Sequence, residues 1–372
     1  MYSQGVLSRR IYMRFMVITR AVVNAGDFLI VRKLNEVLEK IRPNDTFINK
    51  SGFDSFDDEI GLLNTMDGLI IGGGPGYDNR FLNPDNFPLF RHLDEIEVPI
   101  HFVGMGWYGK SAMPEHTKSY QFTDAALAIL NRAAASGSMI GCRDFVTQRV
   151  LDDNQVPCTT MTGCPVWYDY QYLDCLEPRS KTVKKIVLSD PGMTKEAIDH
   201  KPKAQQALQL AAIVRERFPH ADFIYTFNGG IHTKYSTQCN LDILKGLEGL
   251  GIPAVDLTKE KNGFAIYDDA DLHIGFRVHS HIYCLSKRIR SILVEEDARG
   301  FGVNEALGLP NILAFDPEQI SGMQFVPSKS LAQDMDSALD GICTENIEMY
   351  CKAFQSMKRT YEEKMRVQIE NL

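Results

Sequence analysis

The sequence has little that would fix it in a membrane or in an oxidising compartment. Among its 372 residues there is no run of 18 consecutive apolar side chains, so we expect no membrane-spanning helix. The eight cysteines form no CxxC pair and are too scattered for a disulfide scaffold. The polar N-terminus, Met1–Arg10, precedes an apolar run that Arg14 interrupts, which does not fit a signal peptide. These absences predict a cytoplasmic protein with reduced thiols.

Excess positive charge is also lacking, and so are internal repeats and low-complexity stretches. Lys and Arg total 40 against 48 Asp and Glu, a formal net charge of −8. A protein that binds nucleic acid through bulk charge would lean the other way, so no nucleic-acid partner is expected. A composition of 44% hydrophobic and 24% charged residues excludes a disordered chain and a coiled coil. The length predicts two or three globular domains.

What is present is an alternation of short β-rich runs and longer segments of helical period, typical of α/β folds with mainly parallel sheets. A first series has predicted strands at 11–18, 68–71, 98–103, 138–141 and 158–161, with helices after Gly26 and at 117–135 and 143–153. A second series has predicted strands at 185–188, 222–227, 252–255, 272–276, 290–294 and 311–313, with helices at 203–217 and about 236–249.

The stretch 168–182 between the two series has little periodicity and is interpreted as a linker. At the other end, apolar residues recur every three or four positions over 346–372, which predicts one amphipathic packing helix. We therefore expect two Rossmann-like lobes, residues 1–175 and 176–345, facing across a cleft. The helix at 346–372 is expected to cross back and pack on the first lobe.

The glycine run Gly72–Gly76 directly follows a predicted strand. Such a run exposes backbone N–H groups at the carboxyl end of a sheet, where α/β folds bind ligands. No helix is predicted after it, so it starts neither a phosphate-binding P-loop nor a dinucleotide fingerprint. Gly73 and Gly74 are candidates for a substrate loop, and a simple tight turn is the alternative.

A second glycine segment, Gly104–Ser111, satisfies both GxGxxG and GxxxxGKS. Both motifs require a helix to open at once, but Pro114 follows closely, and Trp107 and Tyr108 would crowd a loop around phosphate. Nucleotide chemistry is therefore not favoured. We interpret Gly106 as part of a substrate-facing loop.

Two charged positions stand where predicted strands end and helices begin. Asp27 follows Asn24 and Gly26; it is either a helix N-terminal carboxylate or a ligand for a sugar hydroxyl. Arg143 precedes Asp144 at the start of a helix, a natural anion site, and a surface pair of the two is the alternative.

The segment from Asp271 to His281 carries the densest chemistry. A buried strand is predicted to end at Arg277, Val278 and His279, with Arg277 and His279 on one side of an extended turn. Both side chains could then contact one ligand. His279 and His281 are spaced as in some metal sites, but no third ligand is placed nearby, so no metal is expected.

Taken in order, these motifs resemble those of the polysaccharide pyruvyl transferases. The set covers residues 24–313 and consists of Asn24-x-Gly26-Asp27, Asp67-Gly-Leu-Ile-Ile-Gly-Gly-Gly74, Gly104-x-Gly106, Arg143-Asp144, Arg277-x-His279-Ser280 and Ala306-Leu-Gly-Leu-Pro310. Each motif is weak alone, and the ordered set is more specific. Trp107-Tyr108 and His232 depart from the family pattern, which bears on the acceptor sugar more than on the reaction.

The resemblance implies a GT-B-like fold and transfer of the pyruvyl group of phosphoenolpyruvate to two hydroxyls of a sugar, giving a cyclic ketal and phosphate. It implies that Arg277 and His279 bind phosphoenolpyruvate, with Arg143 as a further anion contact. Ser280 is a candidate donor contact for a different reason, because phosphate is expected to leave from the helix N-terminus beside it. The second lobe would be the donor side and the first the acceptor side. No cofactor is implied. The partners would be phosphoenolpyruvate and a sugar or lipid-linked saccharide, and peripheral membrane association stays open.

Elementary chemistry agrees with these roles. A carboxylate and a phosphate need at least two forked cations, which arginine supplies. Ketal formation needs a proton on the enol carbon, which His279 can transfer near neutral pH, while Asp27 can orient or deprotonate the attacking hydroxyl. Two alternatives remain: a GT-B glycosyltransferase with a nucleotide-sugar donor, and a non-catalytic sugar- or anion-binding relative.

Overall fold

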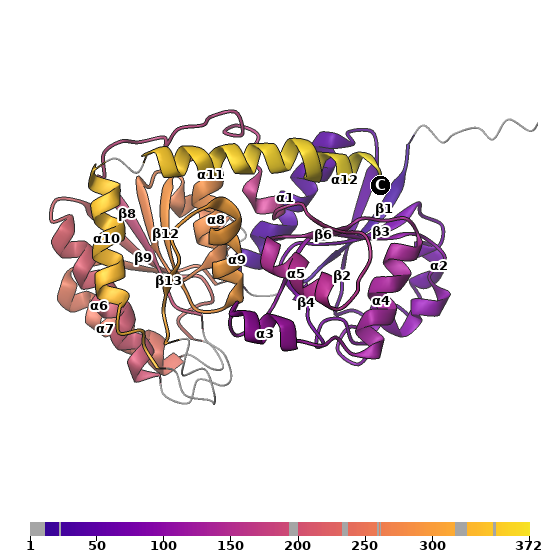
Figure 1. Ribbon diagram of the computed structural model, residues 1–372, viewed down its shortest axis with the longest axis horizontal. Helices are drawn as coiled ribbons and strands as arrows, with labels where there is room; N and C mark the ends of the chain where they lie inside the picture. Colours follow the sequence, from indigo (N-terminus) through magenta and orange to yellow (C-terminus); the bar gives the residue numbers. More distant parts are fainter. Residues whose placement is uncertain are drawn as a thin grey trace, which may run out of the picture.

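The computed structural model describes residues 12–21, 24–192, 200–232, 237–258, 260, 262–316, 326–344 and 347–372 (Figure 1). Two parallel sheets, one of seven strands and one of six, form the centres of two lobes that lie side by side. The residues between them, 168–184, carry neither helix nor strand. The start of the first predicted strand, residue 11, and the N-terminal segment lie outside the described residues.

The first lobe is built around a sheet with strand order β2-β1-β3-β5-β6-β7, and β4 pairs with β5. Its elements are β1 (Arg14–Thr19), α1 (Ala25–Ile41), β2 (Thr46–Ser51), α2 (Ile60–Leu63), β3 (Gly68–Gly72), β4 (Pro75–Tyr77), the 3₁₀ helix η1 (Pro88–Glu95), β5 (Ile100–Trp107), α3 (Pro114–Ser119), α4 (Asp124–Ala135), β6 (Ile140–Cys142), α5 (Phe145–Asp153), β7 (Thr159–Met161) and the 3₁₀ turn η2 (Pro165–Trp167). All eight residues of β5 are buried, as expected of a central parallel strand with both faces covered.

The second lobe has the strand order β10-β9-β8-β11-β12-β13, the order 3-2-1-4-5-6 of Rossmann folds. Its elements are β8 (Lys185–Ser189), α6 (Lys201–Arg217), β9 (Asp222–Phe227), α7 (Thr237–Leu250), β10 (Ala254–Asp256), the 3₁₀ helix η3 (Gly263–Tyr267), β11 (Leu272–Gly275), α8 (Val278–Ser286), β12 (Arg290–Glu295), α9 (Ala298–Leu307), β13 (Ile312–Leu313) and α10 (Leu331–Thr344).

The C-terminal helical segment crosses back to the first lobe, as predicted. It comprises α11 (Ile347–Thr360), a π-helical turn (Tyr361–Met365) and α12 (Arg366–Glu370). In Figure 1, α11 (yellow) runs along the top of both lobes and α12 ends beside the first sheet. There the Gln368 amide donates to the carbonyls of Phe102 (2.8 Å) and Met139 (2.9 Å). These two hydrogen bonds attach α12 to the first lobe.

Several predicted elements need correction. The single helix predicted over 117–135 is two helices, α3 and α4, because Tyr120 is extended and Thr123 caps a new helix by accepting from the Ala126 N–H. The strand β5 runs through the segment predicted as a loop from Gly104, and it ends only at Trp107. The polar edge strand β2, the short β4 and the helices α9 and α10 were not predicted.

The order of strands places the functional residues. In the first sheet the order reverses between β1 and β3, and in the second between β8 and β11. Ligands of open α/β sheets bind outside the carboxyl ends of the strands at such switch points. Arg20, Asp27 and the glycine run follow β1 and β3, while Asp190 and Arg277 follow β8 and β11. Both switch points open toward the boundary between the lobes, where the Ala25 N–H meets the Asn228 carbonyl at 3.4 Å.

Candidate functional site

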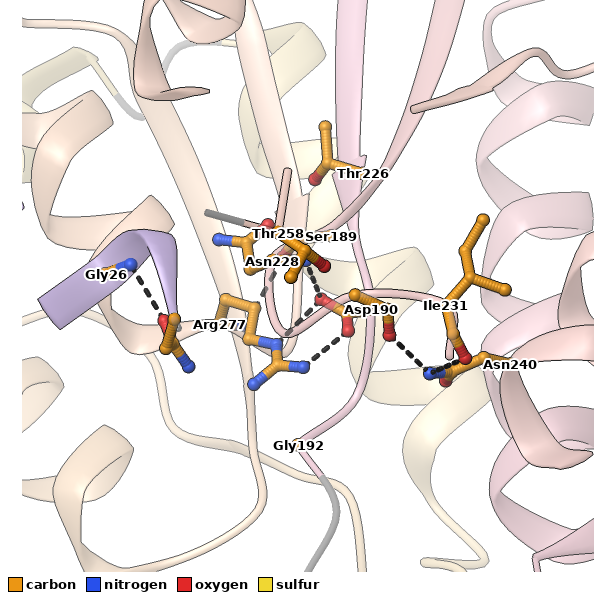
Figure 2. A network of polar contacts seen from close by, with 12 residues as sticks. Gly26, Ser189, Asp190, Gly192, Thr226, Asn228, Ile231, Asn240, Thr258 and Arg277 are labelled. Atoms are coloured by element: carbon orange, nitrogen blue, oxygen red, sulfur yellow. Dashed lines mark hydrogen bonds and ion pairs between the residues drawn. The ribbon is translucent and has the colours of Figure 1, made fainter. Parts of the chain in front are cut away.

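Arg277 is fixed at the carboxyl edge of the second sheet by Asp190. The strand β11 ends at Gly275, so Arg277 is the residue that precedes α8 and not a strand residue as predicted. Its Nε donates to Asp190 Oδ1 at 2.7 Å and its Nη2 donates to Oδ2 (Figure 2). Asp190 is fully buried. Two of the three guanidinium nitrogens are thus held by a buried carboxylate, and Nη1 has no partner among the described residues.

Ser280, in the first turn of α8 after Arg277, is hydrogen-bonded to Tyr267 and Asn228, which are also bonded to each other. Its hydroxyl donates to Tyr267 Oη (2.9 Å) and accepts from Asn228 Nδ2 (2.7 Å). The backbone N–H of Asn228 in turn donates to Asp190 Oδ1 (3.0 Å). Ser280 is completely buried. Its predicted donor contact is therefore not favoured by this geometry, which instead uses Ser280 to support the Asp190–Arg277 pair.

His279 stands in the first turn of α8 and faces the first lobe. A Cβ built on Gly26, in the first turn of α1, would lie 2.8 Å from His279 Nδ1. The other ring nitrogen, Nε2, is buried and has no hydrogen-bond partner in the part of the chain that the structure describes. Burial lowers the pKa of His279 to about 3, assisted by the positive charges of Arg143, Arg299, Arg277 and Arg20. The imidazole is thus neutral near pH 7 and lies within the electrostatic influence of four guanidinium groups.

Asp27 belongs to the same cluster. Its pKa is raised by burial, and the charges of Arg20, Arg299 and Arg277 oppose that rise. Its helix is capped by Asn24, whose Oδ1 accepts from the Gly26 N–H at 2.7 Å. Capping is therefore done by Asn24, which leaves the Asp27 carboxylate beside the arginines.

Arg143 is buried, not on the surface. It is 1% exposed, and its Nε donates to Asp144 Oδ2 at 3.0 Å. Asp144 caps α5 by accepting from the Thr147 N–H at 2.7 Å. Both Nη atoms of Arg143 are buried, and neither has a hydrogen-bond partner among the described residues. Gly106 makes room for this guanidinium, because a Cβ there would lie 2.3 Å from Arg143 Cζ.

The glycine run holds an arginine that sequence reasoning missed. Arg20, at the end of β1, donates to the carbonyls of Pro75 (3.3 Å) and Gly73 (3.4 Å). A Cβ at Gly74 would lie 2.5 Å from Arg20 Nη2, so glycine is needed there for space as well as for its φ of +68°. The Gly73 N–H is already bonded to the Val103 carbonyl. This loop thus positions Arg20 through its carbonyls.

Arg299 was missed as well. It lies in the first turn of α9, and its side chain is paired with Asp297, which precedes that helix. Burial alone would raise the pKa of Asp297, but Arg299 outweighs it and holds the pKa below its ordinary value. Arg20 and Arg299 stand alone in the sequence, and only their places just after β1 and β12 could have marked them.

Both lobes therefore contribute to one cluster of cationic side chains around His279, which we call the anion pocket. Arg20 and Arg143 come from the first lobe, Arg277 and Arg299 from the second, and His279 lies among them. Among the described residues no group of three or more His, Cys, Asp or Glu could hold a metal ion. His281 Nδ1 is bonded to Ser291 Oγ at 2.7 Å, on the far side of α8 from this pocket. Nor is any helix in the described part of the chain long and apolar enough to cross a membrane.

Comparisons with known proteins agree on family and fold. The sequence model of the family described as polysaccharide pyruvyl transferase matches residues 24–297. No curated protein matches the sequence. The solved structure of S. aureus MnaA with UDP has a TM-score of 0.54 and 11% identity over 92% of this chain and 90% of that chain. A putative UDP-N-acetylglucosamine 2-epimerase from Listeria monocytogenes has a TM-score of 0.53 and 10% identity over 93% and 91%. The fold is GT-B-like.

Proposed function

The chain belongs to the polysaccharide pyruvyl transferase family, and on that premise we propose that it transfers the pyruvyl group of phosphoenolpyruvate to two hydroxyls of one sugar. The products are a cyclic pyruvate ketal and inorganic phosphate. One observation carries this proposal: the charges of four arginines from two lobes act on a single histidine whose Nε2 has no hydrogen-bond partner among the described residues.

The charge of the pocket suits this donor. Phosphoenolpyruvate carries a carboxylate and a phosphate, and forked arginine donors bind both groups. Arg277 offers Nη1 and Arg143 offers both Nη atoms, since their other nitrogens are bonded to carboxylates. The carboxylates Asp190 and Asp144 each satisfy only part of one guanidinium, so the remaining nitrogens are left as donors for an anion.

The protons of the reaction balance through His279 and Asp27. One proton adds to the methylene carbon, which becomes the methyl group. The two sugar hydroxyls each form a bond to the central carbon and each lose a proton, while the carbon–oxygen bond to phosphate breaks. Of those two protons, one replaces the proton given to the methylene carbon and one leaves with phosphate. His279 is placed to deliver the first, and Asp27, with its raised pKa, to accept from a hydroxyl.

Donor binding must also prepare His279. With a pKa of about 3, His279 is neutral at pH 7 unless a negative charge is bound beside it. The negative charge of phosphoenolpyruvate offsets the surrounding arginines, and the pKa of His279 then rises toward its ordinary value. The histidine thus takes up its proton together with the donor.

The acceptor is proposed to be a sugar of a polysaccharide or of its lipid-linked precursor, bound toward the first lobe near Asp27. We propose the cytoplasm as its location, on the sequence-based expectation of reduced, scattered cysteines.

The test is an assay of phosphate release from phosphoenolpyruvate with galactosides, glucosides and mannosides, with the ketal identified by mass spectrometry. Arg277→Lys keeps the charge but loses the fork, so the Kd of phosphoenolpyruvate should rise roughly tenfold or more. Arg366→Lys, on α12 away from the site, is the matched control. An unchanged Kd for Arg277→Lys would remove Arg277 from the donor site.

His279→Gln should lower kcat by about 10² or more and change the phosphoenolpyruvate Kd by less than about tenfold. Calorimetry in two buffers of different ionisation enthalpy should show less proton uptake on donor binding than in the unaltered protein. His220→Gln, at an exposed position, is the control. Equal loss of binding and turnover would make His279 a donor ligand only, and a normal kcat would assign the proton transfer to another group.

A nucleotide-sugar enzyme is the second candidate. Two solved structures of this fold are described as complexes with nucleotides: S. aureus MnaA with UDP, and UDP-GlcNAc 2-epimerase from Neisseria meningitidis with UDP-GlcNAc. On that hypothesis the arginines would bind a diphosphate. Hydrolysis of UDP- or GDP-sugars without phosphate release from phosphoenolpyruvate would favour it, and binding of either ligand without turnover would favour a non-catalytic relative.

A further inference from the structure

Arg299, which no sequence motif marks, has a guanidinium edge that no described residue occupies. Its Nε donates to both carboxylate oxygens of Asp297, at 2.9 and 3.0 Å, and Nη2 donates to Oδ2. Nη1 has no partner among the described residues. The guanidinium also lies over the ring of Tyr108, 5.0 Å from its centroid. Asp297 thus holds the Nε and Nη2 edge of the Arg299 guanidinium, and the Tyr108 ring covers one face. The edge that carries Nη1 can bind a ligand.

A second, independent observation lies on the opposite lobe. Arg143 is 1% exposed, and both of its Nη atoms are buried without a partner in the described segments of the chain. Its neighbour Asp144 packs against α9, since a Cβ at Gly302 would lie 2.6 Å from the Asp144 carboxyl carbon. Arg143, which is paired with Asp144, therefore lies near α9, and its charge helps to lower the pKa of Asp297 at the start of that helix. Buried guanidinium nitrogens without acceptors are costly, and a bound anion would supply them.

We propose that Arg143 and Arg299 together bind the phosphate group of the donor, in a subsite formed between the two lobes. This inference rests on the proposed function for the identity of the donor, but the phosphate subsite itself does not require it. Arg277 then takes the carboxylate.

The number of N–H donors that the described residues leave free on each arginine assigns the phosphate and the carboxylate to their binding positions. Arg143 offers two Nη atoms and Arg299 one, whereas Arg277 offers only Nη1 because Asp190 holds the rest. A phosphate dianion has three terminal oxygens and gains charge as its bond to carbon breaks, so it needs the larger set. The backbone of the α9 start is occupied, since Ala298 N–H donates to the Gly109 carbonyl and Arg299 N–H to Asp297. The side chains therefore form the subsite.

Tyr108 is the positioning residue for Arg299. It belongs to the first lobe, and a second guanidinium, that of Arg80, lies 5.1 Å from its ring centroid. The side chain of Arg80 is 75% exposed and is paired with Asp78, so it contributes to the stacking on Tyr108 but not to the pocket. Arg80 thus supplies a matched control for Arg299.

The experiment measures the Kd of inorganic phosphate and of pyruvate by calorimetry, in the full chain and in four variants. Arg299→Lys keeps the ion pair with Asp297 but loses the free edge, and Arg299→Gln loses both. In each we expect phosphate to bind at least tenfold more weakly and pyruvate within twofold of the unaltered protein. Arg80→Gln should change neither Kd. Tyr108→Ala, which removes the aromatic face under Arg299, should weaken phosphate binding and leave pyruvate binding within twofold.

Each other outcome overturns the proposal. Phosphate binding that is unchanged in both Arg299 variants removes Arg299 from the subsite. Equal weakening of phosphate and pyruvate means a general loss of the pocket, and so does the absence of phosphate binding in the unaltered protein. The proposed function fails separately: phosphate binding that depends on Arg299, without turnover of phosphoenolpyruvate on any acceptor, supports the subsite and contradicts the pyruvyl transfer.

Discussion

The imidazole of His279 lies against the backbone of Gly26, across the boundary between the lobes, with Nδ1 2.8 Å from where a Cβ of residue 26 would stand. No side chain fits between them without moving one of the two. The first turn of α1 thus sets the position of the histidine on α8.

Gly26→Ala should therefore displace His279 without disturbing the fold, since residue 26 is helical and alanine favours a helix. We expect kcat to fall at least about tenfold and the phosphoenolpyruvate Kd to stay within about threefold. Steady-state kinetics and calorimetry check this. Gly249→Ala, in α7 with open space around residue 249, is the control and should behave as the unaltered protein. A normal kcat for Gly26→Ala would show that the imidazole position is unimportant.

Gly106→Ala should act through Arg143. The new methyl group would stand 2.3 Å from the guanidinium carbon, and the end of a flexible side chain moves more easily than the strand β5. We expect the phosphoenolpyruvate Kd to rise about tenfold, with the melting temperature nearly unchanged. Both Gly106→Ala and Arg143→Gln act on the same guanidinium. The double variant should therefore bind phosphoenolpyruvate no more weakly than whichever single variant has the higher Kd. Additive losses would contradict this route.

Glu295, at the end of β12, should make stability depend on pH. Burial raises its pKa from 4.5 to about 8, so between these values the folded protein keeps a proton that the unfolded chain releases. This contribution to stability is complete below pH 4.5 and is lost as pH rises through 8. Glu295→Gln removes this titration. The free energy of unfolding of Glu295→Gln minus that of the unaltered protein should therefore be higher at pH 9 than at pH 5, by about 2 kcal/mol or more.

Urea unfolding at the two pH values measures the difference, with the exposed Glu363→Gln as control. The same relative stability at both pH values would mean that Glu295 is already ionised near neutrality.

Arg288 should matter for stability and not for binding. Its guanidinium donates to the carbonyls of Cys175, Leu285, Ser286 and Leu173, which joins the segment between the lobes to the end of α8. Its ring partner is Phe354 of α11, at 4.8 Å. Arg288→Lys leaves several buried carbonyls without donors, so we expect a loss of about 2 to 4 kcal/mol in the free energy of unfolding. A loss of donor affinity at low denaturant would show that this anchor also shapes the pocket.

The sequence predicted the central strands because they are buried on both faces and therefore apolar. It missed β2 because the edge strand Thr46–Ser51 is polar and partly exposed. The same limit explains the helix predicted over 117–135: periodicity continues across Tyr120–Thr123, but the backbone there is extended. Local pattern does not record such a break.

For the site, the sequence identified residues that follow a strand and belong to a recognisable motif, such as Arg277 and His279. Arg20 and Arg299 belong to no such motif. Their charges act on His279 because the switch points of the two separate sheets lie at the boundary between the lobes. Ser280 shows the opposite case: its position in the motif suggested contact with the donor, while its burial assigns the hydroxyl to Tyr267 and Asn228. Which side of a helix faces the ligand is decided by packing that the motif does not encode.

The return of α12 to the first lobe fixes an order of assembly during synthesis. The carbonyls of Phe102 and Met139 obtain their Gln368 donor only after the whole second lobe has left the ribosome, and Met365 is fully buried in the same core as β1 and α1. The lobe that is made first is thus completed last. On a ribosome translating at about 5 to 20 residues per second, an emerging first lobe waits on the order of ten seconds or more with this surface uncovered. Chaperones that protect apolar surfaces on nascent chains have that interval in which to act.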